Sequence, residues 1–98
     1  MKVTVLFVDG VRAHLVRRFG GVGLGMVTRE TCHLASDRDV AELHDFARDV
    51  GIPRSAYHPH AQHPHYDLTA ERRVLAVAAG AVEVTSKELV RRCFRRRP

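Results

Sequence analysis

The chain opens with a short apolar run, Val3 to Val8, that is rich in β-branched residues and stops at Asp9-Gly10. A continuous apolar run of this length is typical of a strand that is buried on both faces. Asp9-Gly10 is a turn signal that ends the strand. Because ligands bind at the carboxyl ends of strands in open α/β sheets, Asp9 is a candidate site residue.

The next segment, residues 11–29, shows no clear period, and glycines crowd its 19–26 portion. A phosphate-binding loop would need a Lys-Ser/Thr pair after the last glycine, or a helix that opens there. The residues that follow, Met26-Val-Thr-Arg29, supply neither. We therefore expect a mobile loop or a glycine-rich hairpin.

A strand followed directly by a helix is predicted over residues 30–51. Glu30 to Ala35 has strand character, with His33 near its carboxyl end, and Ser36 or Asp37 is expected to cap the helix. Apolar residues then recur at helical spacing, namely Val40, Leu43, Phe46, Ala47 and Val50. Gly51 is a good helix terminator.

The remainder predicts a loop, a helix, a strand and a last helix. Residues 52–62 form the loop, Thr69 opens a helix that runs to Gly80, and residues 81–84 form a short strand. Thr85-Ser-Lys-Glu88 matches a capping box. The apolar residues of the last helix are expected to point inward: Leu89, Val90, Cys93 and Phe94. The pattern predicts one compact α/β domain over residues 1–90, with a small, mainly parallel sheet and three helices.

Charge sets the C-terminal end, residues 91–98, apart from this domain. The chain of 98 residues has a net charge of +5. The excess lies in residues 85–98, where Glu88 opposes six basic residues, Lys87, Arg91, Arg92, Arg95, Arg96 and Arg97. Five of these are arginines that are candidates for binding nucleic acid or another anion. The alternative is a solvated end whose arginines suit a helix C-terminus.

Cysteine usage and hydropathy indicate the cellular compartment that we expect for the protein. Cys32 and Cys93 lie on different predicted elements and are expected to be free thiols in a reducing compartment. The N-terminal apolar run is too short for a signal peptide or a membrane span, so we expect a cytoplasmic protein without a membrane partner. The core of so short a chain is modest, and a homodimer would supplement it.

The histidines are the most concentrated group of candidate site residues in the sequence. Four of the seven lie between His58 and His65, and the segment ends in His65-Tyr66-Asp67. Alternate residues of an extended chain share a face, so His63, His65 and Asp67 are expected to point the same way. Three such ligands suit zinc or another first-row divalent metal. Asp67 could instead orient His65 as a general base, or merely serve the start of the following helix.

Two further histidines have competing interpretations. His33 is either a buried, hydrogen-bonded core residue or, at the end of its strand, a site residue. His44 lies on or beside the apolar stripe of the first helix, where a histidine is often a satisfied residue at the core edge.

Five short motifs follow one another along the chain: Val8-Asp9, His33-Leu34-Ala-Ser-Asp37, Glu42-Leu-His44, His63-Pro-His-Tyr-Asp67 and Gly80-Ala-Val-Glu-Val84. In the order of these motifs the chain resembles a small bacterial and phage family of unknown function. The resemblance covers roughly residues 3–9 and 30–92. It implies no activity, but it gives weight to five positions that match the shared pattern: Asp9, His33, His44, His65 and Asp67. It also implies that His58 and His60 lie in a variable loop.

These observations predict one pocket at the carboxyl edge of the sheet, built from those five residues. Its metal ligands would be His33, His44, His65 and Asp67, and its catalytic residues Asp9, His33, His65 and Asp67. We expect a metal-assisted hydrolase, with zinc as the metal, that acts on a phosphate-bearing small molecule or a nucleic acid. The alternative is a non-catalytic module that binds nucleic acid or protein through Arg91, Arg92 and Arg95–Arg97.

Overall fold

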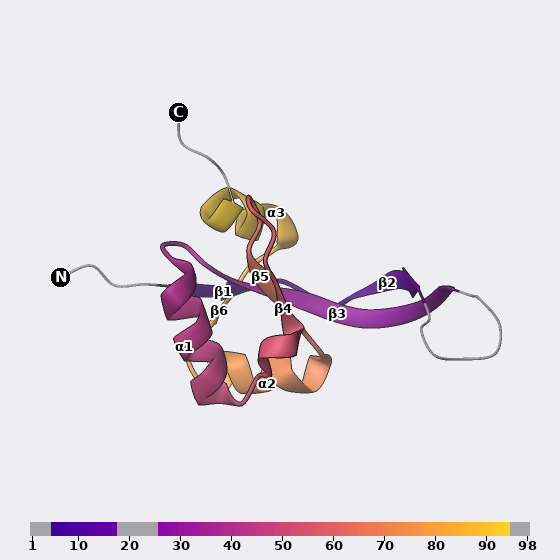
Figure 1. Ribbon diagram of the computed structural model, residues 1–98, viewed down its shortest axis with the longest axis horizontal. Helices are drawn as coiled ribbons and strands as arrows, with labels where there is room; N and C mark the ends of the chain where they lie inside the picture. The colour runs from indigo at the N-terminus through magenta and orange to yellow at the C-terminus, as the bar shows by residue number, and fades with distance from the viewer. Residues whose placement is uncertain (1–4, 18–25, 95–98) are drawn as a thin grey trace.

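One long strand, whose first part belongs to a β-hairpin, organises the fold. The computed structural model describes residues 5–17 and 26–94, so the glycine-rich segment lies outside the described residues except for Met26. Strands β2 (Arg12–Arg17) and β3 (Met26–Ser36) pair antiparallel, as the hairpin alternative predicted. The outer part of this hairpin projects away from the helices, while the rest of β3 runs through the body of the sheet (Figure 1).

The sheet is mixed, not mainly parallel as predicted. Its order is β4-β5-β3-β1-β6, with β2 attached to β3 alone. The remaining strands are short: β1 (Leu6–Val8), β4 (Tyr57–His58), β5 (His65–Leu68) and β6 (Val82–Glu83). Within the described residues, only β1 and β6 pair in parallel. The prediction was wrong because β3 returns from the hairpin to lie antiparallel to β1, although a helix follows it.

The helices cover opposite faces of the sheet. Helices α1 (Val40–Val50) and α2 (Ala70–Ala78) lie on one face, and α3 (Ser86–Leu89) lies on the other (Figure 1). A single π-helical turn, Val90–Phe94, continues α3. The site residues are therefore sorted by which face of the sheet they reach.

Local capping explains where each helix begins. Asp39 caps α1 by accepting the Glu42 N–H at 2.8 Å, so the predicted caps Ser36 and Asp37 were wrong. Asp37 instead accepts the Val5 N–H at the start of β1. Three predicted boundary residues are confirmed: Gly51 ends α1 with a φ of 89°, Thr69 caps α2 and Thr85 caps α3.

The larger hydrophobic core lies under α1 and α2, where the buried side chains include Leu34, Leu43 and Leu68. The smaller core lies under α3 and contains Phe7, Ala35 and Leu89, with Cys93 and Phe94 packed against it. Val90 is 50% exposed, so its predicted inward position was wrong. A π-helical turn has more residues per turn than an α-helix, which changes the face that Val90 presents.

Two general predictions about the chain have structural counterparts. Cys32 and Cys93 are free thiols, as expected. Burial raises the pKa of Cys32 to about 11 and that of Cys93 to about 12, so both thiols are protonated near neutral pH. In the described part of the chain, no helix has the length and apolar character to cross a membrane.

Candidate metal centre

Strand alternation sends two sets of side chains to opposite faces of the sheet. On β5, Tyr66 and Leu68 are buried in the larger core, whereas His65 and Asp67 alternate with them. On β3, His33 pairs directly with Asp67. His58 on β4 likewise pairs with His65. The strand register therefore brings four polar side chains together on the face that carries α3.

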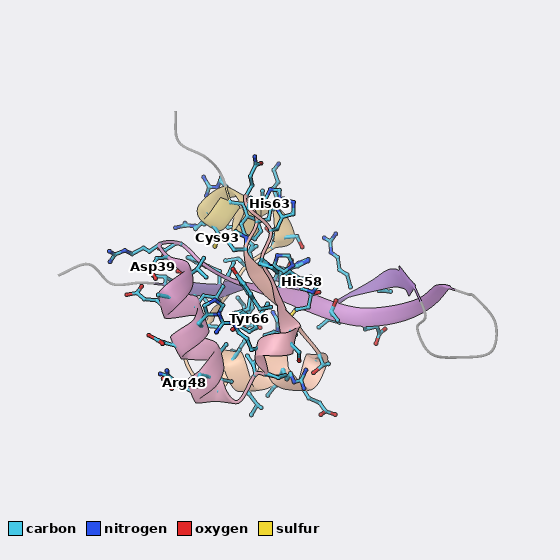
Figure 2. All side chains as sticks on the ribbon, viewed as in Figure 1. Asp39, Arg48, His58, His63, Tyr66 and Cys93 are labelled. Atoms are coloured by element: carbon cyan, nitrogen blue, oxygen red, sulfur yellow. The ribbon has the colours of Figure 1, made fainter. Side chains whose placement is uncertain are left out.

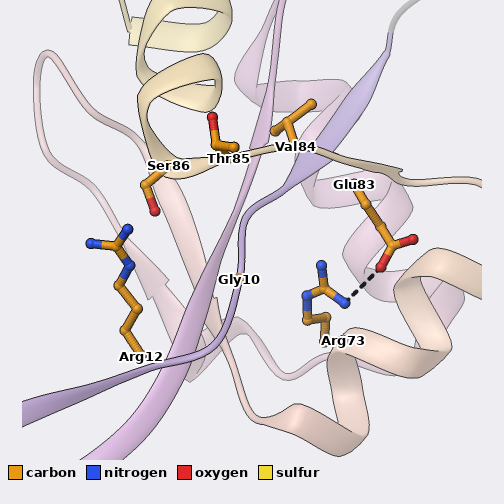
Figure 3. A pocket seen from close by; sticks show the side chains of 7 residues that line it. All are labelled: Gly10, Arg12, Arg73, Glu83, Val84, Thr85 and Ser86. Atoms are coloured by element: carbon orange, nitrogen blue, oxygen red, sulfur yellow. Dashed lines mark hydrogen bonds and ion pairs between the residues drawn. The ribbon is translucent and has the colours of Figure 1, made fainter.

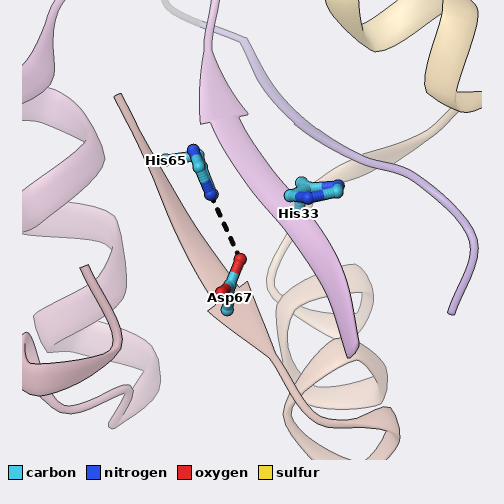
Figure 4. A group of neighbouring side chains, drawn as sticks. All are labelled: His33, His65 and Asp67. Atoms are coloured by element: carbon cyan, nitrogen blue, oxygen red, sulfur yellow. Dashed lines mark ion pairs between the residues drawn. The ribbon is translucent and has the colours of Figure 1, made fainter. Parts of the chain in front are cut away.

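Three of these side chains form a cluster with metal-binding geometry. His33, His65 and Asp67 each offer a ligand atom, and these atoms all lie within 4.8 Å of one another (Figure 4). His65 Nε2 lies 3.2 Å from Asp67 Oδ1, and His58 Nε2 lies 2.7 Å from Asp67 Oδ2. Two nitrogens and a carboxylate oxygen match the donor set of zinc sites.

A buried aspartate holds the His33 ring. Asp9 follows β1, is 1% exposed, and accepts the His33 backbone N–H at 2.7 Å through Oδ1. Its Oδ2 lies 2.8 Å from His33 Nδ1 and accepts the Ser86 hydroxyl at 2.9 Å. Arg73 Nε donates to the Asp9 carbonyl oxygen at 2.7 Å. The carboxylate thus accepts hydrogen bonds at both oxygens and fixes the orientation of the His33 ring through Nδ1.

The His65 ring is held by a different acceptor. Its Nδ1 lies 2.5 Å from the backbone carbonyl oxygen of His63. A carbonyl only accepts, so Nδ1 carries the proton. The neutral ring then has its lone pair at Nε2, which faces the Asp67 carboxylate. Two lone pairs do not attract each other, so a cation between the two groups would make this contact favourable.

The electrostatics of the cluster favour charged carboxylates. Burial alone would raise the pKa of Asp9 and of Asp67, but hydrogen bonds and nearby histidines outweigh it and lower both. For Asp9 these partners are His33 and Ser86, and for Asp67 they are chiefly His65 and His58. The Asp9 hydrogen bond in turn raises the pKa of His33. The site therefore concentrates negative charge next to imidazole nitrogens.

A pocket of about 290 Å³ opens over the cluster, between the sheet and the segment from Ser86 to Phe94. Its polar side contains Asp9, His33, His63, His65 and Ser86, and its apolar side contains Leu89, Val90 and Phe94. The His63 ring packs edge-on against Phe94 at 5.1 Å, beside the C-terminal helical segment (Figure 2). The arrangement leaves room for a ligand next to two of the candidate metal ligands, His33 and His65.

Comparison with known protein families gives a match over most of the chain. The model of the family described as protein of unknown function (DUF4031) matches residues 23–96. The chain belongs to the DUF4031 family. Comparisons with curated proteins and with solved structures found no match. The matched span includes every residue of the candidate metal centre except Asp9.

In this DUF4031 domain His44 does not join the predicted pocket. It lies on α1, on the opposite side of the sheet, where its Nδ1 is 2.6 Å from the hydroxyl of the buried Tyr66. Burial, assisted by the charge of Arg54, lowers the pKa of His44. His44 is therefore a hydrogen-bonded histidine at the edge of the core, as one of its two interpretations held. The site also lies on the sheet face rather than at a carboxyl edge, because His33 and Asp67 meet along paired strands.

His58 is the residue that sequence reasoning missed. We expected His58, like His60, to lie in a variable loop without a role in the site. Instead it belongs to β4, and its ring stacks on that of His65 with 5.1 Å between the ring centroids. A two-residue strand is too short to show alternation, so no period could identify it. His60 is exposed and stacks on His63, away from the Asp67 carboxylate.

Two arginines of the C-terminal end, Arg91 and Arg92, share one carboxylate partner. Arg91 and Arg92 both bind Glu88, at 2.6 Å and 2.7 Å. These hydrogen bonds lower the pKa of Glu88 to about 2. The Glu88 carboxylate is thus used by the arginines, while Thr85 Oγ1 accepts the Glu88 N–H, so only half of the predicted capping box forms. Residues Arg95–Arg97 lie outside the described residues.

Proposed function

We propose that the protein is a metal-dependent hydrolase whose zinc ion is held by His33, His65 and Asp67. Catalytic zinc sites use three protein ligands and keep a further position for water, which matches a three-ligand cluster beside a pocket. Structural zinc sites, by contrast, are usually closed by four ligands. The donor set therefore favours a reactive site over a structural one.

The observation that carries this proposal is the pair of hydrogen bonds at the two Nδ1 atoms. Metal-binding histidines usually donate their other ring N–H to a carboxylate or a backbone carbonyl. His33 has the carboxylate of Asp9, and His65 has the carbonyl of His63. In such a site each ring would bind the metal through Nε2. A cation there also relieves the unfavourable contact between the His65 lone pair and the Asp67 carboxylate.

The chemistry of such a site is hydrolysis. Bound zinc lowers the pKa of its water ligand towards neutrality and so supplies hydroxide as a nucleophile. On the protein side, His33, His65 and Asp67 would hold the metal, Asp9 would fix the His33 tautomer, and His58 would hydrogen-bond the second Asp67 oxygen. The apolar wall of Leu89, Val90 and Phe94 suits an organic group attached to the reacting centre. We propose a phosphate-bearing substrate, such as a nucleotide or nucleic acid.

Metal analysis of the purified protein tests the proposal. We expect about one zinc ion per chain, and a melting temperature that rises with zinc and falls with a chelator. Calorimetric zinc titration should show affinity lowered by more than about a hundredfold in His33→Ala, His65→Ala and Asp67→Asn, since even indirect partners of a metal change affinity by about 10- to 100-fold.

His60→Ala is the matched control, because His60 belongs to the same histidine-rich segment but not to the cluster. It should retain the affinity of the unmodified protein. Equal losses in His60→Ala and His65→Ala would indicate adventitious binding to surface histidines. No stoichiometric metal and no response of the melting temperature to divalent ions would refute the metal centre.

The competing function, a binding module that uses the arginine-rich end, has its own test. Replacing Arg95, Arg96 and Arg97 by glutamine removes charge but keeps Phe94 in its packing position. If the tail binds nucleic acid, this triple variant should lose affinity and much of its dependence on salt. Unchanged binding in that variant would exclude the tail as the contact.

A further inference from the structure

A second recess adjoins the candidate metal centre and contains a cation that the centre does not use. It has a volume of about 460 Å³ and is lined by Gly10, Arg12, Arg73, Glu83, Val84, Thr85 and Ser86 (Figure 3). Ser86 also lines the pocket over the histidines. Because Asp9 in that pocket directly precedes Gly10, the two spaces meet along the end of β1.

Strand register places Arg12 on the same face as the candidate ligands. Arg12 pairs with Thr31, and paired residues of neighbouring strands project to the same side. Thr31 and His33 are two residues apart on β3, so their side chains share a face about 7 Å apart. Arg12 is also close enough for its charge to oppose protonation of His33.

The two arginines of the recess differ in how their charge is used. Arg73 is neutralised by Glu83 at 2.9 Å and also binds the Asp9 carbonyl. Within the described part of the chain, Arg12 has no carboxylate partner, and its guanidinium points towards Ser86 across the recess (Figure 3). Thr85 Oγ1 accepts the Glu88 N–H, so its hydroxyl proton is available for donation into the recess.

We propose that this recess is an anion subsite in which Arg12 binds a phosphate group of the ligand. The inference rests on the proposed function for its role in catalysis, because it places the anionic part of the substrate beside the metal. Guanidinium groups match phosphate oxygens through two parallel N–H donors, which gives both affinity and orientation. The subsite thus assigns the recognition of phosphate to Arg12 at the base of the hairpin rather than to the C-terminal arginines.

Inorganic phosphate, titrated into chelator-treated protein and followed by ¹H–¹⁵N NMR, tests the subsite apart from any metal. We expect shifts at the amides of Gly10, Arg12, Thr85 and Ser86. Arg12→Gln should weaken binding by about 10- to 100-fold, the usual effect of losing a charge-assisted hydrogen bond. Arg12→Lys should recover part of it, because lysine keeps the charge but not the two-pronged geometry.

Arg38→Gln is the control, since Arg38 is an exposed arginine that does not line the recess. It should bind phosphate as the unmodified protein does. If Arg12→Gln binds phosphate as tightly as Arg38→Gln, the subsite is wrong. Zinc titrations of the same variants separate the two proposals. If the protein binds zinc but its phosphate affinity does not depend on Arg12, only the anion subsite is wrong. Phosphate binding that depends on Arg12, in a protein that takes up no zinc, overturns only the metal centre.

Discussion

The two faces of the sheet differ in what they bury. Under α1 and α2 the sheet contributes Val8, Cys32, Leu34, Tyr66 and Leu68 to the larger core. On the α3 face, the described side chains of the same strands, β1, β3 and β5, contribute only Phe7 and Ala35 to the smaller core. The rest of that face carries polar groups, and Asp9 is buried among them. The same strands thus contribute to stability on one side and carry the candidate site on the other.

This division follows from the two-residue repeat of a strand. A shift of register by one residue would exchange the two faces, moving Tyr66 and Leu68 out of the core and His65 and Asp67 into it. Burying the carboxylate and the imidazole in the larger core without partners would be strongly unfavourable. The apolar face therefore fixes the register that assembles the polar cluster.

Leu68→Ala should give the largest effect, because it acts on the apolar face. Leu68 is fully buried on β5, directly beside Asp67 in sequence. Removing its side chain leaves a cavity and should lower the free energy of unfolding by about 2–5 kcal/mol, measured by urea denaturation. Leu75→Ala on α2 is the same chemical change at a position that is 53% exposed, and should alter stability by less than about 0.5 kcal/mol.

Zinc affinity of the folded Leu68→Ala protein separates the two roles. If the apolar face contributes stability but no ligands, affinity measured well below the melting temperature should match that of the unmodified protein. A large loss of affinity in the folded variant would show that the two faces are not separable. Equal destabilisation by Leu75→Ala would contradict the assignment of the core.

The apolar face was also the part that the sequence predicted best. The helical spacing of α1, the terminator Gly51 and the cap Thr69 depend on local chemistry, and the structure confirms them. Strand direction was not predictable in this way. It depends on how β1 and β3 are connected, and the glycine-rich segment between them has no period that reveals the hairpin.

The polar cluster was predicted only where local alternation determines it. The shared face of His65 and Asp67 follows directly from their spacing, and the cluster includes His33 as expected. His44 was misplaced because helical periodicity shows which side of a helix is buried but not which face of the sheet it covers. His58 was missed because its position depends on pairing with His65, a tertiary contact.

Asp9→Asn should give the next largest effect, confined to the α3 face. An asparagine keeps one acceptor but presents an NH₂ group to a position that now receives donors from His33 and Ser86. His33 would then favour the tautomer with its proton on Nε2. A protonated Nε2 has no lone pair to offer a metal. Zinc affinity should fall about 10- to 100-fold in a calorimetric titration.

Asp37→Asn is the comparison for this change. Asp37 accepts a single backbone N–H, from Val5, and lies outside the cluster. An asparagine can keep that hydrogen bond through its remaining oxygen, so zinc affinity should not change. Unaltered affinity in Asp9→Asn as well would mean that Asp9 does not position His33 for metal binding.

The last comparison changes no residue and uses one histidine from each face. In chelator-treated protein, the hydrogen bond to Asp9 raises the pKa of His33 above its ordinary value of 6.5, whereas burial and then Arg54 lower that of His44 below it. The stability that His33 contributes is complete below pH 6.5 and is lost as pH rises through its raised pKa. That of His44 is complete above pH 6.5 and is lost as pH falls through its lowered pKa. Imidazole ¹H–¹⁵N spectra recorded as the pH is lowered should show His33 becoming protonated before His44. The reverse order would contradict the contrast between the two faces.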